Sequence, residues 1–282
     1  MTDTVFGDAL GPRGRRRAAI ASVVSILVAG ALAVAAVRRL AERGILDGDR
    51  WSYFLDANVV RFLASGALAT LKVAVVAMTL SIAIGAVLAL CRLSRPIPTR
   101  FLAGTYVELF RALPLVLLIL YAGRALPQLG LRLSPFWYLV IGLTAYNAAV
   151  LAEIFRAGIL SLDRGQSEAA YALGLTYGEA MRSVIVPQAV RRMIPSIISQ
   201  LVTLLKDTSL GFVLPYEELL RRGQIAGEEG RNILQALVVV AVMYIAVNAS
   251  LSALANRLAR RQDHRAAPVA GPLVPESVAD PT

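Results

Sequence analysis

The sequence predicts an all-α, polytopic membrane protein with about six transmembrane helices. Of its 282 residues, 57% are hydrophobic and 17% are charged, whereas a soluble domain carries about 25% charged residues. The charges are also unevenly spread, because long stretches have none. Each stretch is near or above the roughly 18 apolar residues that mark a membrane-spanning helix. The uncharged stretches are 18–37, 73–91, 133–152 and 232–256.

Six spanning helices are expected once charged flanks and shorter apolar runs are included. Two of them need argument. The third contains Glu108 and Arg111, which are three residues apart and can pair on one helical face. The fifth is apolar only between Arg192 and Lys206 and contains Pro195, so we expect a kink or exposure to a cavity. The predicted spans are 18–37, 62–91, 101–122, 135–156, 190–207 and 233–256.

The net charge of +10 comes almost entirely from arginines that flank the apolar runs. That placement indicates topology signals and anionic headgroups, not nucleic acid. The basic bias favours a multi-pass protein of the cell membrane with both termini in the cytoplasm, although Arg38 and Arg39 argue the other way for the first helix. Cys91 is the only cysteine and His264 the only histidine, so no disulfide or His/Cys metal cluster is expected.

One segment between the fourth and fifth predicted spans is longer than a plain connection requires. We call residues 165–187 the helical knob. Its first helix is expected to end at Gly174 in the left-handed conformation. Thr176 and Glu179 form a T-x-x-E capping box that begins a second helix, which Pro187 is expected to stop or kink. A structured insertion of this kind favours docking on a partner over simple linkage.

The helical knob carries a family resemblance. Glu168-Ala169-Ala170, then Gly174, then Val184-Ile185-Val186-Pro187 resembles the EAA motif of importer permeases in the ATP-binding-cassette (ABC) family, with valines in place of the usual isoleucine and leucine. The surroundings resemble the polar amino acid permeases, although Ala112-Leu113 stands where that subfamily has Gly-Thr. The similar blocks are 108–115, 153–159, 165–168, 187–189 and 205–210.

The resemblance implies a five-helix core with an added N-terminal helix, paired with a second permease subunit. It also implies a separate ATPase dimer that holds ATP and Mg²⁺, and an extracytoplasmic solute-binding protein that delivers an amino acid. The sequence has no G-x₄-G-K-[ST] loop, so no cofactor and no enzymatic activity are expected in this chain. The residues expected to couple it to the ATPase are Gly165, Gln166, Glu168, Ala169, Ala170, Gly174 and Pro187.

Ionisable and polar residues inside the predicted spans are candidates for function, because burying them in a membrane is costly. Two interpretations stay open: ion pairs that lock the helices, or groups that line a substrate pathway. The candidates are Glu108, Arg111, Tyr146, Glu153, Arg156, Gln200, Lys206, Asp207, Thr208 and Ser209.

The preferred substrate is glutamate, over glutamine, arginine or cystine, because Arg111, Arg156 and Lys206 would suit an acidic molecule. The alternative function is a secondary amino acid transporter or channel that works without an ATPase. No inverted repeat supports that alternative. A membrane enzyme is disfavoured because no Ser/His pair, HExxH or paired aspartates appear.

The expected organisation has four parts. They are a cytoplasmic basic tail at 1–17, an N-terminal transmembrane helix with an extracytoplasmic loop at 18–60, a permease domain at 61–262 with its coupling helix at about 165–174, and a disordered cytoplasmic tail at 263–282.

Overall fold

The computed structural model describes residues 11–264, and within that range it is helical and contains no strand. The all-α prediction is confirmed. The elements are α1 (Pro12–Glu42), α2 (Gly48–Ser52), η1 (Tyr53–Leu55), α3 (Ala57–Leu93), α4 (Ile97–Ala112), α5 (Leu115–Gln128), α6 (Pro135–Leu160), α7 (Arg164–Ala172), α8 (Tyr177–Ala180), η2 (Met181–Ile185), α9 (Val186–Asp207), η3 (Thr208–Val213), α10 (Leu219–Glu229) and α11 (Ile233–His264).

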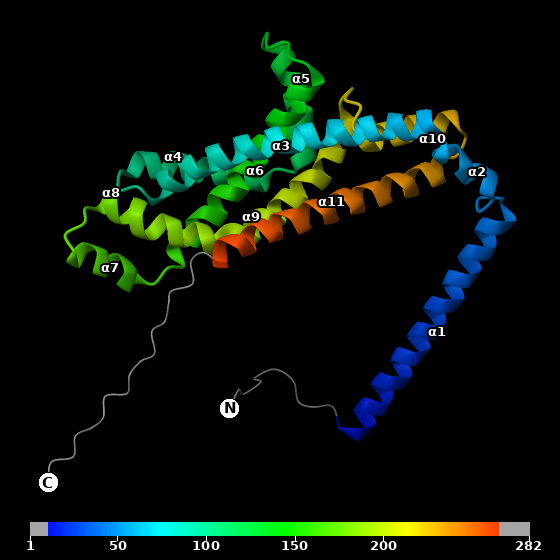
Figure 1. The fold of residues 1–282 in the computed structure, drawn as a ribbon, viewed down its shortest axis with the longest axis horizontal. Coiled ribbons are helices and arrows are strands. Elements are labelled where there is room, and N and C mark those ends of the chain that lie inside the picture. The colour runs from blue at the N-terminus through cyan, green and yellow to red at the C-terminus, as the bar shows by residue number, and fades with distance from the viewer. Residues whose placement is uncertain (1–10, 265–282) are drawn as a thin grey trace.

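Helix α6 is the centre of the bundle and packs against α3, α4, α5 and α9 (Figure 1). Small residues let the backbones approach closely, as in membrane helix pairs generally. A Cβ atom built on Gly142 of α6 would lie 2.8 Å from the Ile119 Cα of α5. One built on Gly85 of α3 would lie 3.0 Å from the Ala148 carbonyl oxygen of α6. The core therefore depends on glycine at these two crossings.

The single helix predicted over 101–122 is wrong. The chain forms α4 and α5, whose axes are bent by 103° at the break between them. Leu113 is extended, with ψ 136°. Pro114 follows it and disfavours the helical conformation of the preceding residue. The proline therefore breaks the predicted span into two helices.

The structure contains four helices long and apolar enough to cross a membrane among the described residues, or five if the α4–α5 pair is one span. These are α1, α3, α6 and α11. The fifth predicted span, 190–207, lies in α9, which does not meet that test. Its polar residues lower its hydropathy, yet it runs inside the bundle and packs against α6 and α11.

Helix α1 extends away from the bundle, and none of its apolar window is buried (Figure 1). It begins at Pro12, so Arg13–Arg17, expected in a basic tail, form its first turns. The tail predicted at 263–282 lies outside the described residues, except that 263 and 264 continue α11. Residues 1–10 also lie outside the described range.

Candidate functional site

The first helix of the knob, α7, is closed at both ends by local hydrogen bonds. The Asp163 carboxylate accepts from the Gly165 N–H at 2.8 Å and caps the N-terminus. At the other end, the Leu175 N–H bonds to the Ala170 carbonyl oxygen and the Gly174 N–H to that of Tyr171. These two bonds are a Schellman motif, and Gly174 has φ +81° as predicted.

The predicted capping box at the start of α8 is confirmed. The Thr176 N–H donates to the Glu179 carboxylate at 2.8 Å, and the Glu179 N–H donates to the Thr176 hydroxyl at 3.4 Å. The Thr176 hydroxyl also donates to this carboxylate, and these bonds hold the pKa of Glu179 below its ordinary value. The bend between α7 and α8 is therefore defined by three residues: Gly174, Thr176 and Glu179.

Pro187 does not end the second helix of the knob, contrary to the first of the two predicted outcomes. α8 continues through the π-helical turn η2 into α9, and Pro187 occupies the first turn of α9. Proline cannot donate a backbone hydrogen bond, so the ladder must be interrupted near it. The Val186 N–H bonds to the Met181 carbonyl oxygen, five residues back, and this wider turn absorbs the interruption.

The knob exposes most of the predicted coupling residues but not all. Glu168 and Ala169 are exposed on α7, followed by Leu173, which is 83% exposed. Ala170 is buried, so it packs inside the knob. Gln166 accepts a hydrogen bond from the Gln188 side chain of α9 at 3.0 Å.

A second hydrogen bond, besides that between Gln188 and Gln166, joins α9 to the segment just before the knob. The Arg192 guanidinium donates to the Ser161 carbonyl oxygen at 2.8 Å, just before α7 begins. The bond between Gln188 and Gln166 lies one helical turn away on α9. α7 is therefore attached to α9 by side chains as well as through the chain.

Glu153 of α6 is the centre of an ion-pair network that joins three helices. Its predicted pairing with Arg156 is confirmed, at 2.6 Å. Arg92 of α3 also donates to its carboxylate, and Arg111 of α4 lies 3.9 Å away. The predicted Glu108–Arg111 pair is wrong, since Arg111 is directed to Glu153 and Glu108 is exposed.

A groove of about 390 Å³ runs along α9, and its lining includes Ser252 of α11 and the apolar residues Pro195, Ile198 and Val202. Its α9 side carries Ser199, Thr203 and Lys206, which recur at helical spacing. Both hydroxyls donate to carbonyl oxygens one turn back, at 3.0 Å. Lys206 is exposed and has no ion pair within 4.0 Å in the part of the chain described.

The remaining polar candidates do not line this groove. Gln200 donates to the buried Asn147 side chain of α6 at 2.7 Å. Thr208 is buried and Ser209 is half-buried, and each hydroxyl donates to a carbonyl oxygen three residues back. Tyr146 and Asp207 are half-buried. Gln200 and Thr208 thus have structural partners.

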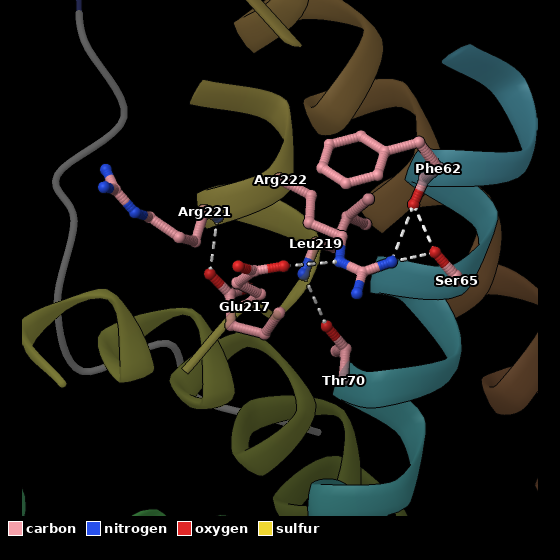
Figure 2. Close-up of polar contacts among 8 residues, drawn as sticks. Phe62, Ser65, Thr70, Glu217, Leu219, Arg221 and Arg222 are labelled. Atoms are coloured by element: carbon pink, nitrogen blue, oxygen red, sulfur yellow. Dashed lines mark hydrogen bonds and ion pairs between the residues drawn. The ribbon is translucent and has the colours of Figure 1, made fainter. Parts of the chain in front are cut away.

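Sequence reasoning missed a junction between α10 and α3 (Figure 2). The Arg222 guanidinium lies 4.8 Å from the Phe62 ring centroid, donates to the Ser65 hydroxyl and pairs with Glu217 at 3.4 Å. The Leu219 N–H donates to the Thr70 hydroxyl at 3.1 Å.

The residue before this junction helix, Glu218, is fully buried. Its carboxylate caps α10 and accepts a hydrogen bond from the Tyr244 hydroxyl of α11 at 2.7 Å. The partners that join this junction to other helices, Ser65 for Arg222 and Tyr244 for Glu218, lie too far along the chain to be recognised from the sequence. The junction fixes α10 at the end of the bundle opposite the helical knob (Figure 1).

Residues 81–264 match the family described as binding-protein-dependent transport system inner membrane component. The chain belongs to this family. The permease is 39% identical over 226 residues to the glutamate transport system permease protein GluD of Corynebacterium glutamicum, covering 79% of this chain and 83% of that protein. It is 40% identical over 204 residues to the probable glutamine ABC transporter permease protein GlnP of Bacillus subtilis, covering 71% and 94%.

A solved structure of an amino acid ABC transporter with histidines superposes on this permease with a TM-score of 0.68 at 31% identity, covering 72% of this chain and 95% of that one. The predicted likeness to polar amino acid permeases of ABC importers is thereby confirmed. In this permease, the helical knob and the groove along α9 are the two candidate functional sites.

Proposed function

We propose that this permease conducts glutamate across the cytoplasmic membrane and that its helical knob docks on a separate ATPase. The observation that carries the proposal is the continuity of the knob with the groove helix. α8, η2 and α9 form one unbroken helical rod from Tyr177 to Asp207. A displacement of α7 would reach this rod through the capped bend at 173–176 and through the hydrogen bonds that Gln188 and Arg192 of α9 make with Gln166 and Ser161.

The rod is long enough to connect the two faces of a membrane. At 1.5 Å per residue, Pro187 and Lys206 are about 29 Å apart along α9, close to the thickness of the hydrocarbon core. In this proposal Glu168 and Ala169 contact the ATPase, while Gly165 and Gly174 shape the ends of α7. Gln166 links α7 to α9, Ala170 supports the knob from inside, and Pro187 marks the π-helical turn.

Glutamate is supported by the charge of the groove and by one relative. Of the three basic residues expected to meet an acidic substrate, Arg111 and Arg156 are engaged with Glu153. Lys206 lines the groove and forms no ion pair within 4.0 Å among the described residues. An exposed ammonium group near the end of α9 farthest from the helical knob is suited to a substrate carboxylate. GluD, named for glutamate transport, is among the relatives.

The partners in this proposal are an ATPase dimer holding ATP and Mg²⁺, a second permease subunit and an extracytoplasmic solute-binding protein. We also propose that both termini lie in the cytoplasm, because the segments next to the helical knob carry an excess of arginines. The network around Glu153 serves as a structural lock of α3, α4 and α6 in this account.

Reversing the charge of Glu168 tests the docking of the helical knob. Glu168 is exposed and has no ion pair among the described residues, so Glu168→Arg leaves the fold intact. We expect it to lower the ATPase that co-purifies with the tagged permease by about tenfold, as for a misplaced interface charge. Glu228→Arg, an exposed site on α10 at the other end, is the control. Full ATPase recovery with Glu168→Arg would contradict the proposal.

A further inference from the structure

A pocket of about 420 Å³ lies where the end of α3, the start of α4 and the end of α6 meet. It is separate from the α9 groove and lies at the end of the bundle that carries α7 (Figure 1). Its charged lining consists of Arg92, Arg100, Arg156 and Glu108, and its apolar lining includes Ile97 and Phe101. Neither the transport pathway nor the helical knob accounts for it.

The pocket and the adjacent ion-pair network around Glu153 contain more positive than negative side chains. Four arginines (92, 100, 111 and 156) and two glutamates (108 and 153) leave an excess of two positive charges. Arg100 is exposed and has no ion pair in the described chain. The Arg156 Nε is buried without a hydrogen-bond partner among the described residues. This chemistry favours an anion, and guanidinium groups suit phosphate in particular.

The pocket lies at the depth of lipid headgroups. α3 has 37 residues and is therefore about 55 Å long, well beyond the roughly 30 Å of the hydrocarbon core. Arg92 is the second-last residue of α3, so it lies near the membrane surface. Ile97 and Phe101, which are 70% and 68% exposed, extend the pocket with an apolar surface. A ligand with a phosphate group and an acyl chain would match both the arginines and the apolar surface of the pocket.

We propose that this pocket binds the phosphate of an anionic phospholipid, with Arg100 as its exposed ligand and Arg92 and Arg156 behind it. Basic pockets between membrane helices on the cytoplasmic side recognise such headgroups. The assignment to the inner leaflet rests on the proposed function, which places α7 in the cytoplasm. The lipid would also bridge α3, α4 and α6 beside the Glu153 network.

Lipid titration of the purified full-length permease tests this site. Dioleoylphosphatidylglycerol, dioleoylphosphatidylcholine and inorganic phosphate are added in separate arms, with bound lipid measured by native mass spectrometry and stability by thermal unfolding. We expect phosphatidylglycerol alone to bind and to raise the melting temperature. Arg100→Gln should weaken its binding about fivefold, the effect of one surface arginine.

Arg95→Gln is the matched control, because Arg95 is exposed in the same α3–α4 connection but does not line the pocket. It should change phosphatidylglycerol binding less than about twofold. Equal losses in the two variants, or equal binding of phosphatidylcholine, would overturn the site. Equal stabilisation by inorganic phosphate would replace the lipid with a soluble anion. The titration contains no ATPase, so failed docking of the knob would leave its result unaffected.

Discussion

At the scale of single residues, the permease separates its basic side chains into two groups. Arg92, Arg111 and Arg156 surround one carboxylate, Glu153, and join three helices. Lys206 instead lines the groove along α9 and forms no ion pair within 4.0 Å among the described residues. The hydroxyls beside it donate to their own helix, which leaves their oxygen lone pairs available. In the proposed function, the first group locks the helices together and Lys206 meets the substrate carboxylate.

Lys206→Gln is therefore expected to weaken glutamate transport selectively. Removing one charge-assisted hydrogen bond should raise the glutamate concentration for half-maximal uptake about tenfold. Lys72→Gln is the matched control, since Lys72 is exposed on α3 and does not line the groove. Uptake of radiolabelled glutamate into proteoliposomes containing the assembled importer measures both. Equal effects of the two variants would remove Lys206 from the pathway.

Sequence predicted the residue pairs only where helical spacing alone decides them. Glu153 and Arg156 are three residues apart on α6 and form the expected pair. Glu108 and Arg111 have the same spacing, but Arg111 is directed to Glu153. Arg92 reaches Glu153 across 61 residues of chain, which periodicity cannot reveal. Helical spacing therefore identifies possible ion-pair partners, and the packing of the helices determines which pair forms.

At the scale of elements, the sequence predicted the turn between two helices, but it did not predict where a helix breaks or continues. Gly174 and the Thr176–Glu179 pair predicted the bend between α7 and α8, because each acts through bonds within a few residues. Pro114 and Pro187 had opposite outcomes. At Pro114 the chain breaks into α4 and α5, whose axes are bent by 103°. At Pro187 the helix continues, because a π-helical turn precedes the proline. Which outcome a proline has depends on the packing of the flanking helices.

The packing of α5 on α6 depends on Gly142, so Gly142→Leu is expected to destabilise the bundle. The new side chain would begin 2.8 Å from the Ile119 Cα, a backbone atom that cannot move aside alone. Overpacking of this kind costs about 2 kcal/mol, or a melting temperature about 5 °C lower. Gly30→Leu on exposed α1 has open space around it and is the control. Thermal unfolding in detergent that shows equal melting temperatures would contradict the close crossing.

At the scale of the whole molecule, the helical rod from Tyr177 to Asp207 connects the two proposed working parts. The knob lies at one end of the bundle and the junction of α10 with α3 at the other (Figure 1). Sequence predicted most of the helices and the knob, but not the break between α4 and α5 or the packing of α3, α4, α5 and α9 around α6. The exposed length of α1 and the uncovered surface of α7 leave room for further subunits.

Coupling through the helical knob is tested most directly by comparing Gly174→Val with Gly178→Val. Both glycines have open space around them, but only Gly174 has a positive φ, which valine disfavours strongly. The measurement is ATP hydrolysis by the reconstituted importer with and without its binding protein and glutamate. We expect Gly174→Val to assemble and lose most of the glutamate stimulation, while Gly178→Val retains it. Undiminished stimulation in Gly174→Val would contradict the account.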